Sequence, residues 1–549
     1  MFLPLGNHDG SGDGAAVELP TEIEELSLGS TGVLEDRLSA LPDDSDGAAV
    51  ELPTVIGELS LGSTGVLEDR LSALPDDILR LILLRLSSTT TAARTSVLSR
   101  RWRGLWAQLP EIHFPFPSDP AAIGPALTAT AACPDLRLLH VACREDAGAE
   151  AWLHTAASRL VAGGELYFYN RTPEQERANV GALSWKCLTL HLPCFETAAR
   201  VWLRLGFVDL ELPLAGVFSR LTELRLELVT LDSESESELG DMVSSPRCPV
   251  LRELCISLVR GLDSLCIISD TLERLELNML NGLKELTINA PMLIALNVVA
   301  CFIRSRRKPV AAIYASSLEL LWWCDAFDPS FVVFSKMPNL QQLITFPIPV
   351  FGRINFGLLQ DSVRLLHHFP MVYQLDLILD YERDLSKYQY LMGNITRLPN
   401  INTLSVWLET KGHAIAASVF HLLSICPGVR KLKVTLRDDL EVDAPCTSIC
   451  ACCEQQNWCT PYNLDILEEV EIHNFRESNH DFAFLGMLLD MSMEIKKMTL
   501  RLHHLASPSE LLLSLGNLGS CFEIKYDTSE VSYEPPSSLF PGTSDDQCD

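Results

Sequence analysis

The sequence has no apolar run that approaches the roughly 18 residues a helix needs to cross a bilayer. Its opening, MFLPLGNHDG, holds neither a basic region nor an apolar segment long enough for export, so we expect no signal peptide. Positive charge is scarce: 43 Lys and Arg against 72 Asp and Glu give a net charge of −29. Because phosphate backbones require a basic surface, this balance argues against a nucleic-acid partner. We therefore predict an intracellular protein, nuclear or cytoplasmic, that binds neither nucleic acid nor membrane.

The common catalytic motifs are missing as well. The chain contains no G-x-x-x-x-G-K phosphate loop, no H-E-x-x-H and no G-x-S-x-G. Its 17 cysteines are odd in number and scattered over 549 residues, which favours reduced thiols over a disulfide framework. We predict no catalytic residue, no cofactor and no metal ligand. An enzyme with a cysteine nucleophile has no positive support.

The N-terminal region is strongly acidic and contains an internal duplication. Residues 1–77 hold 17 Asp and Glu against two Arg, and residues 78–114 hold six Arg against a single Glu. Asp13–Asp44 matches Asp46–Asp77 at 30 of 32 positions. Only the second copy runs on into an apolar helical pattern, so it is predicted to be the working copy. We expect residues 1–68 to be a disordered acidic segment that contains the partial duplicate.

Three short helices are predicted directly after the second copy. Pro75 suits a first helical turn, and Ile78–Leu86 is apolar except for Arg80 and Arg85. A second helix is expected from near Ala92 to Leu98, and Ser99 is a plausible N-cap for a third. The third carries an apolar stripe at i, i+3, i+4 and i+7: Trp102, Leu105, Trp106 and Leu109. Three short helices form too small a core to bury all of these apolar side chains. The remaining apolar surface indicates a binding surface.

The stretch RLSALPDDILRLILLRLSSTTTAARTSVLSRRWRGLWAQLP, across Arg70–Pro110, resembles the F-box of plant F-box proteins. The resemblance implies that residues 69–114 dock the Skp-type adaptor of a cullin-RING ubiquitin ligase. The adaptors of this family are acidic, which suits the local excess of Arg. The residues that would face or support the adaptor are Leu74, Pro75, Ile78, Ile82, Val97, Leu98 and Trp102, with Leu105 and Trp106 as further candidates. For Leu105 and Trp106 an internal core position is equally open, and the whole segment could instead be a small helical cap on the next domain.

After Phe114 the pattern L-x-x-L-x-(L/I/V) recurs many times, which is typical of the strands of leucine-rich repeats. Examples are Leu251/Leu254/Ile256, Leu272/Leu275/Leu277, Leu293/Leu296/Val298, Ile401/Leu404/Val406 and Val429/Leu432/Val434. Between residues 251 and 293 the units start every 10 or 11 residues, too few for a strand and a helix, so strands are expected on both walls with a full repeat of about 21 residues. Later repeats should gain helices, with Val419, Leu422, Leu423 and Cys426 on one helical face. We expect an α/β fold: the F-box, then an arc-shaped solenoid over residues 115–440.

Residues 441–515 resemble the FBD domain of many plant F-box proteins, on the basis of Cys450-x-Cys452, Asn457-Trp458, LEEVEIHNF and KKMTL. Phe482, Leu485 and Leu489 give one helical face between two strands. We therefore expect a strand–helix–strand unit that caps the open end of the solenoid. Residues 516–549 are Pro/Ser/Asp-rich towards the end and are predicted to be a disordered tail.

Five cysteines gather at the start of this unit: Cys446, Cys450, Cys452, Cys453 and Cys459. Structural zinc sites favour cysteine pairs two to four residues apart in two clusters, whereas here one pair is adjacent and another is separated by a single residue. We therefore interpret these residues as buried or loop thiols. The basic run Arg304–Lys308 is interpreted as a solvated loop in preference to a nuclear import signal.

Together these features predict the substrate-recognition subunit of a cullin-RING ubiquitin ligase, without chemistry of its own. Its F-box would bind the adaptor, and its repeats would hold a target protein. The alternative is a non-ligase interaction scaffold in which the F-box is vestigial.

Overall fold

The computed structural model describes residues 74–526 apart from 87, 133–134, 144–147, 171–188, 232–234, 281, 303–309, 353–356, 438–445, 447–449, 454–463, 492–494 and 504–521. The acidic duplicate, the basic run at 304–308, Cys459 and Asn457-Trp458 lie outside the described residues. Among the helices that are described, none is long and apolar enough to span a membrane.

The first described segment forms the expected group of short helices. They are α2 (Asp76–Leu84), α3 (Thr89–Arg94) and α4 (Trp102–Leu105), with 3-10 turns at Thr95–Val97 and Trp106–Gln108. Asp76 and Asp77 lie in the first turn of α2, where the helix dipole favours negative charge. The expected N-cap Ser99 is wrong, because α4 begins at Trp102 with Arg101 before it. The second helix begins at Thr89, since Ser88 is the residue whose hydroxyl accepts the free N–H of Thr90.

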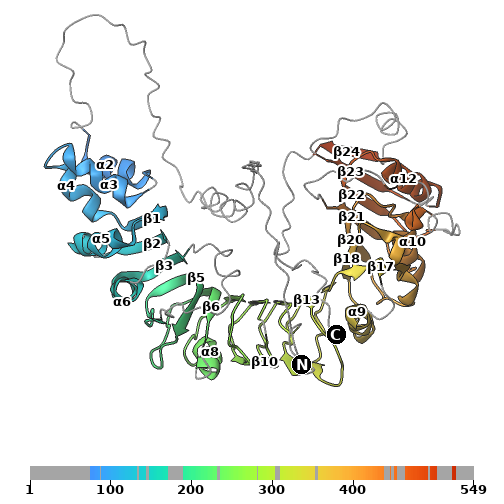
Figure 1. Cartoon of the computed structure of the whole chain (residues 1–549), viewed down its shortest axis with the longest axis horizontal. Helices are drawn as coiled ribbons and strands as arrows, with labels where there is room; N and C mark the ends of the chain where they lie inside the picture. Colours follow the sequence, from blue (N-terminus) through green and yellow to red (C-terminus); the bar gives the residue numbers. More distant parts are fainter. Residues whose placement is uncertain are drawn as a thin grey trace, which may run out of the picture. The chain divides into compact units, whose positions relative to one another are not determined.

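Most of the strands in the remaining described chain belong to one large sheet whose mapped strand pairings are all parallel (Figure 1). Its strands are β1 (Glu111–Ser118), β2 (Leu136–Cys143), β3 (Leu160–Asn170), β4 (Thr189–His191), β5 (Ala198–Glu211), β6 (Glu223–Thr230), β7 (Glu253–Ser257), β9 (Arg274–Asn278), β11 (Ala295–Val299), β13 (Leu320–Cys324), β15 (Gln342–Thr345), β16 (Ile348–Pro349), β18 (Gln374–Asp380), β20 (Thr403–Glu409), β21 (Lys431–Leu436), β22 (Glu469–Phe475), β23 (Lys497–Leu502) and β24 (Phe522–Tyr526). Apart from the edge pieces β4 and β16, each strand pairs with the next one along the chain, as in a solenoid. The first strand starts at Glu111, slightly before the predicted domain boundary at 114.

The middle of the chain has strands on both walls, which confirms the expected short repeat. A second parallel sheet contains β8 (Ser264–Ile268), β10 (Glu285–Asn289), β12 (Val310–Tyr314) and β14 (Val332–Phe334). In the large sheet Glu253 pairs with Arg274 and Arg274 with Ala295, so the repeat here is 21 residues. The leucines of the repeated pattern, such as Leu275 and Leu286, are buried between the two sheets.

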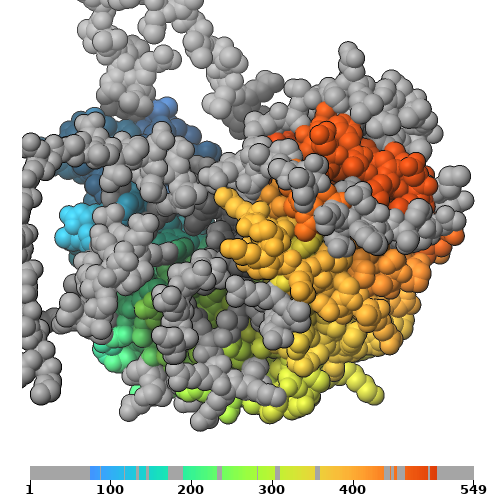
Figure 2. All heavy atoms as spheres, turned by 45° about the vertical axis from the view of Figure 1, so that its right-hand side comes forward, coloured from blue at the N-terminus to red at the C-terminus, as the bar shows by residue number. Residues whose placement is uncertain are grey.

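Helices replace the second sheet towards both ends of the solenoid. They are α5 (Ile123–Ala129), α6 (Ala149–Arg159), α8 (Ser235–Val243), α9 (Gly357–His368), α10 (Ala416–Ile425) and α12 (Asn479–Met491). The predicted inner face of α10 is confirmed, because Val419, Leu422 and Leu423 are buried. Figure 2 shows the later repeats, coloured yellow to red, stacked on one another in chain order.

The C-terminal strand–helix–strand order is present as β22, α12 and β23, but β22 pairs directly with β21 and so continues the same sheet. On α12 the buried side chains include Phe484, Leu485 and Leu488. Of the residues predicted to share one face, Leu485 is buried, whereas Phe482 and Leu489 are only partly buried. The prediction of a disordered tail over 516–549 is wrong at β24, which pairs in parallel with β23. The alternation in Phe522–Tyr526 (FEIKY) was a strand signal that the polar residues around it obscured.

One buried carboxylate fixes the turn between β11 and the next strand. Asp325 Oδ2 accepts the backbone N–H groups of Cys301 and Phe302, the latter at 3.0 Å, and Oδ1 accepts that of Ala326 at 2.9 Å. Burial raises the pKa of Asp325 to about 7. The side chain therefore satisfies three backbone donors from two adjacent repeats.

We expect Asp325→Ala to lower the free energy of unfolding by about 2–4 kcal/mol, because buried N–H groups lose their acceptor. The folded pKa lies above the ordinary value of about 3.9, so the folded state binds the extra proton and this group's contribution to stability decreases as pH rises from about 4 to about 7. Thermal unfolding of the wild type and of Asp325→Asn across that range measures the effect. Equal pH dependence in the two proteins would contradict it.

Candidate functional site

Helix α2 has one buried and one exposed apolar face. Leu79 and Leu83 are fully buried in a small cluster that is separate from the solenoid core. Ile78, Leu81 and Ile82 are exposed, with Leu81 at 58%. Their i, i+3, i+4 spacing places them together on the side of the helix that the cluster does not use. The apolar sequence of α2 is thus covered on one side only.

Two further apolar side chains are exposed at the end of the 3-10 turn that follows α3. Val97 is 86% exposed and Leu98 is 62% exposed. Bulky apolar residues that remain this accessible in a folded helical unit indicate an interaction site. We call Ile78, Leu81, Ile82, Val97 and Leu98 the docking face.

The structure divides the predicted adaptor-binding residues into surface and interior. Pro75, Ile78, Ile82, Val97 and Leu98 are exposed. Leu74 and Trp106 are partly buried against the small cluster. Trp102 and Leu105 are 5% and 3% exposed and belong to this cluster, so they can support the docking face but do not lie on it. For Leu105 this selects the core position of the two that the sequence left open. Their stripe marked the inner side of α4, because three short helices need their largest side chains to form any core. Leu81 was not among the predicted contact residues, although it lies three positions after Ile78 and so shares its side of the helix.

Polar contacts hold α2 against the later part of the unit. Arg101 donates to Asp76 Oδ1 at 2.7 Å and to the carbonyl oxygen of Leu74 at 2.5 Å. Arg80 donates to Gln108 Oε1 at 2.7 Å. Four more arginines on the unit are exposed: Arg85, Arg94, Arg100 and Arg103. The docking face therefore lies on a braced unit with a positively charged surface.

A second surface lies on the side of the large sheet that faces away from the leucine core. Strand pairing places one residue from each successive repeat in a single line, which we call the cross-strand row. Its members are His113, His140, Tyr167, Trp202, Arg225, Cys255, Glu276, Asn297, Trp322, Ile344, Asp376, Ser405, Lys433, Glu471 and Thr499. Because side chains alternate across a strand, this row is separate from the buried leucines on either side of it.

The first part of the row is aromatic and then charged. The Tyr167 and Trp202 rings meet edge to face with centroids 4.9 Å apart, and the Arg225 guanidinium lies 4.5 Å from the Trp202 centroid. Arg225 also donates to Glu223 at 3.0 Å. Aromatic rings and a guanidinium group suit contact with a peptide or protein surface.

The later part of the row contains a groove of about 270 Å³. It is lined by residues of β15, β18, β20, β21 and β22, among them Ile344, Asp376, Ile378, Trp407, Lys433 and His473. Gln342 donates to Asp376 Oδ2 at 2.7 Å, and Gln374 donates to Oδ1 at 3.1 Å. Burial raises the pKa of Asp376, while the hydrogen bonds from Gln342, Ser405 and Gln374 oppose that shift. An apolar groove with a few fixed polar groups is the usual form of a recognition site.

The described thiols with a resolved shift are not activated. Burial raises the pKa of Cys248, Cys255, Cys426 and Cys446 to about 12 in each case. A nucleophilic cysteine requires a lowered pKa, so these four do not support an enzyme with a Cys nucleophile. One group near Cys446 has the donor types of a metal site and is considered below.

Comparison with known proteins supports the F-box and repeat assignments. The family described as "F-box domain" matches residues 71–113, which lie at and beyond the second copy of the duplication. The family described as "FBD-associated F-box protein At5g56370, LRR repeats" matches residues 149–344. An Arabidopsis thaliana protein named as an F-box/FBD/LRR-repeat protein, At4g03220, is 25% identical over 297 residues. That alignment covers 52% of this chain and 59% of the relative. The resemblance to plant F-box/LRR/FBD proteins is confirmed: an F-box is followed by leucine-rich repeats.

Substitutions on the two faces of α2 should change stability by very different amounts. Leu79→Ala should destabilise the helical unit by about 2–5 kcal/mol, because it opens a cavity in a small core. Ile78→Ala, on the exposed side of the same helix, should change stability by about 0.5 kcal/mol or less. Proteolysis of the intact chain, monitored at the Arg80–Arg103 region by mass spectrometry, measures local opening. Equal protection in both variants would contradict this description of the core.

Proposed function

We propose that the chain is the substrate-recognition subunit of an SCF-type cullin-RING ubiquitin ligase in the nucleus or cytoplasm. F-box domains generally bind Skp-type adaptors, and the docking face would provide that contact here. The observation that carries the proposal is the exposure of Ile78, Leu81, Ile82, Val97 and Leu98 over a core that is already complete without them. A partner surface is the simplest reason for retaining such side chains.

Charge supports the same partner. Arg85, Arg94, Arg100 and Arg103 are exposed on the helical unit, although the whole chain is strongly acidic. An acidic adaptor would be attracted to this unit and repelled by most of the rest. The alternative scaffold with a vestigial F-box would be favoured if later parts of the chain covered the docking face. Among the described residues no such cover exists, because all five side chains are exposed.

The target would bind along the cross-strand row. Its groove combines the apolar surface of Trp407 and Ile378 with the fixed carboxylate of Asp376, which suits a protein or peptide segment. Catalysis would occur by proximity, since holding a target lysine beside the charged conjugating enzyme raises its effective concentration. In this proposal the chain itself performs no covalent step.

The first experiment is co-purification of the intact chain with a Skp-type adaptor. We expect Leu81→Asp and Val97→Asp each to reduce adaptor recovery at least about tenfold, because each buries a charge in an apolar contact. The matched control is Leu214→Asp, which changes an 81% exposed leucine in the solenoid and should leave recovery unchanged. Deletion of residues 1–66 should also leave it unchanged, because the F-box match starts at residue 71.

If the chain that lacks residues 1–66 no longer bound the adaptor, the second copy and the helices after it would not be sufficient for adaptor binding. Absence of binding by a folded intact chain would reject the ligase proposal and favour the scaffold. Circular dichroism of each variant separates lost binding from lost folding.

A further inference from the structure

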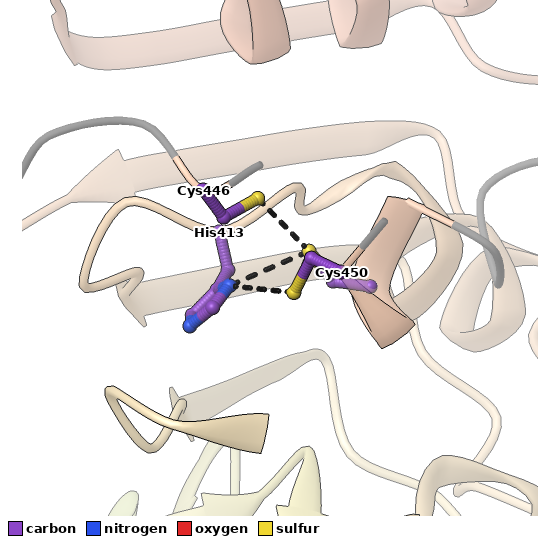
Figure 3. A group of neighbouring side chains, drawn as sticks. His413, Cys446 and Cys450 are labelled. Atoms are coloured by element: carbon purple, nitrogen blue, oxygen red, sulfur yellow. Dashed lines mark hydrogen bonds between the residues drawn. The ribbon is translucent and has the colours of Figure 1, made fainter. Parts of the chain in front are cut away.

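Four side chains from two distant segments converge beside helix α10. His413 belongs to the turn between β20 and α10, while Cys446, Cys450 and Cys452 belong to the connection between β21 and β22. Figure 3 shows His413, Cys446 and Cys450 directed towards one another. One donor atom from each of the four lies within 4.8 Å of all the others. Three sulfurs and one imidazole nitrogen are a common ligand set for structural zinc.

Four of the six donor–donor separations are close to, or slightly shorter than, those of a tetrahedral zinc site. Cys452 Sγ lies 3.4 Å from Cys446 Sγ and 3.3 Å from Cys450 Sγ. His413 Nδ1 lies 3.4 Å from the sulfurs of both Cys450 and Cys452. Zinc bond lengths imply edges of roughly 3.8 Å between two sulfurs and roughly 3.5 Å between sulfur and nitrogen. The four donors thus stand near the corners that an ion requires.

The surroundings of His413 leave its Nδ1 atom available as a metal ligand. Its Nε2 lies 3.2 Å from the backbone carbonyl oxygen of Arg383, and a carbonyl can only accept a hydrogen bond. The proton is therefore placed on Nε2, which leaves the lone pair of Nδ1 directed at the sulfurs. Metal-binding histidines are usually oriented in this way by an acceptor on the other ring nitrogen. The stacked ring of Tyr381, 6.1 Å away between centroids, restricts the imidazole further.

The backbone around the thiols is arranged for the same purpose. The N–H of Ala414 points at Cys452 Sγ at 3.5 Å, which would stabilise a thiolate. The N–H of Cys446 donates to the carbonyl oxygen of Gly412 at 3.1 Å and so ties the two segments together. Lys411 and Gly412 have positive φ values of 46° and 82°, which form the sharp turn that presents His413.

We propose that His413, Cys446, Cys450 and Cys452 bind one structural zinc ion. The cysteine spacing alone disfavoured such a site because it did not include His413, which lies 33 residues before Cys446 in the sequence. The ion would brace the connection between β21 and β22, whose paired residues Lys431 and Glu469 are 38 positions apart. A crosslink of that kind limits the freedom of a long connection.

A second group overlaps the first at Cys446. Its sulfur lies 3.3 Å from His480 Nε2 and 3.7 Å from Cys453 Sγ. This group offers only three donors, one of them shared, so the proposal assigns the ion to the four-donor set. Cys453 consequently provides a neighbouring control within the same cluster.

The test is metal analysis of the full-length chain purified under reducing conditions without added metal. We expect about one zinc ion per chain in the wild type and less than about one fifth of that in Cys452→Ser and in His413→Ala. Two matched controls should keep the ion: Cys453→Ser, in the overlapping group, and Cys266→Ser, an exposed thiol in the second sheet.

A second measurement uses only the wild type, in case the variants fail to fold. Cysteine alkylation followed by mass spectrometry should show Cys446, Cys450 and Cys452 protected in the zinc-bound chain and reactive after chelation. Cobalt(II) added to the stripped chain should give the visible absorption of a tetrahedral thiolate site. A metal-free native chain that does not take up zinc would overturn the proposal, as would zinc retained in both ligand variants or a disulfide among these cysteines.

Discussion

The parallel register of the buried leucine ladder is the constraint on which the other features depend. Leu275, Leu296 and their equivalents stack at one level from repeat to repeat, and no single repeat could bury these side chains alone. Because side chains alternate along a strand, fixing the ladder also fixes what lies on the opposite face. A slip of one residue would exchange Glu276 for Leu275 on that face and break the cross-strand row. The composition of the cross-strand row is thus a consequence of core packing.

The helical unit differs from the solenoid, because it buries few apolar side chains and exposes several others. Its core contains little beyond Leu79, Leu83, Trp102, Leu105 and Leu109, and it leaves the apolar side chains of the docking face uncovered. It joins the solenoid through the strand that follows it, where the N–H of His113 donates to the Thr89 hydroxyl at 2.8 Å. That bond links α3 to the first member of the cross-strand row. The small unit therefore gains support from the large sheet while keeping its apolar face free.

Sequence patterns predicted the features that follow from the spacing of apolar residues. They missed the features that depend on contacts between segments far apart in the sequence. The 21-residue repeat with strands on both walls followed from spacing alone, and so did the buried face of α10. The sequence left Leu105 open between core and surface, because an apolar stripe on a helix does not show whether it faces the core or a partner. The relation of His413 to Cys452 could not be found from sequence, because the folding of two separate connections brings them together. Strand β24 was missed because its alternation is short and its flanks are polar.

The uninterrupted order of strands gives the molecule a defined internal length. Eleven strand-to-strand steps separate β1, beside the helical unit, from β20, which carries Trp407. At about 4.8 Å a step, the contour along the sheet is roughly 50 Å. Each repeat adds one such increment, together with the twist between neighbouring strands. The number of repeats therefore sets how far the groove lies from the helical unit along the sheet, and in which direction the groove faces.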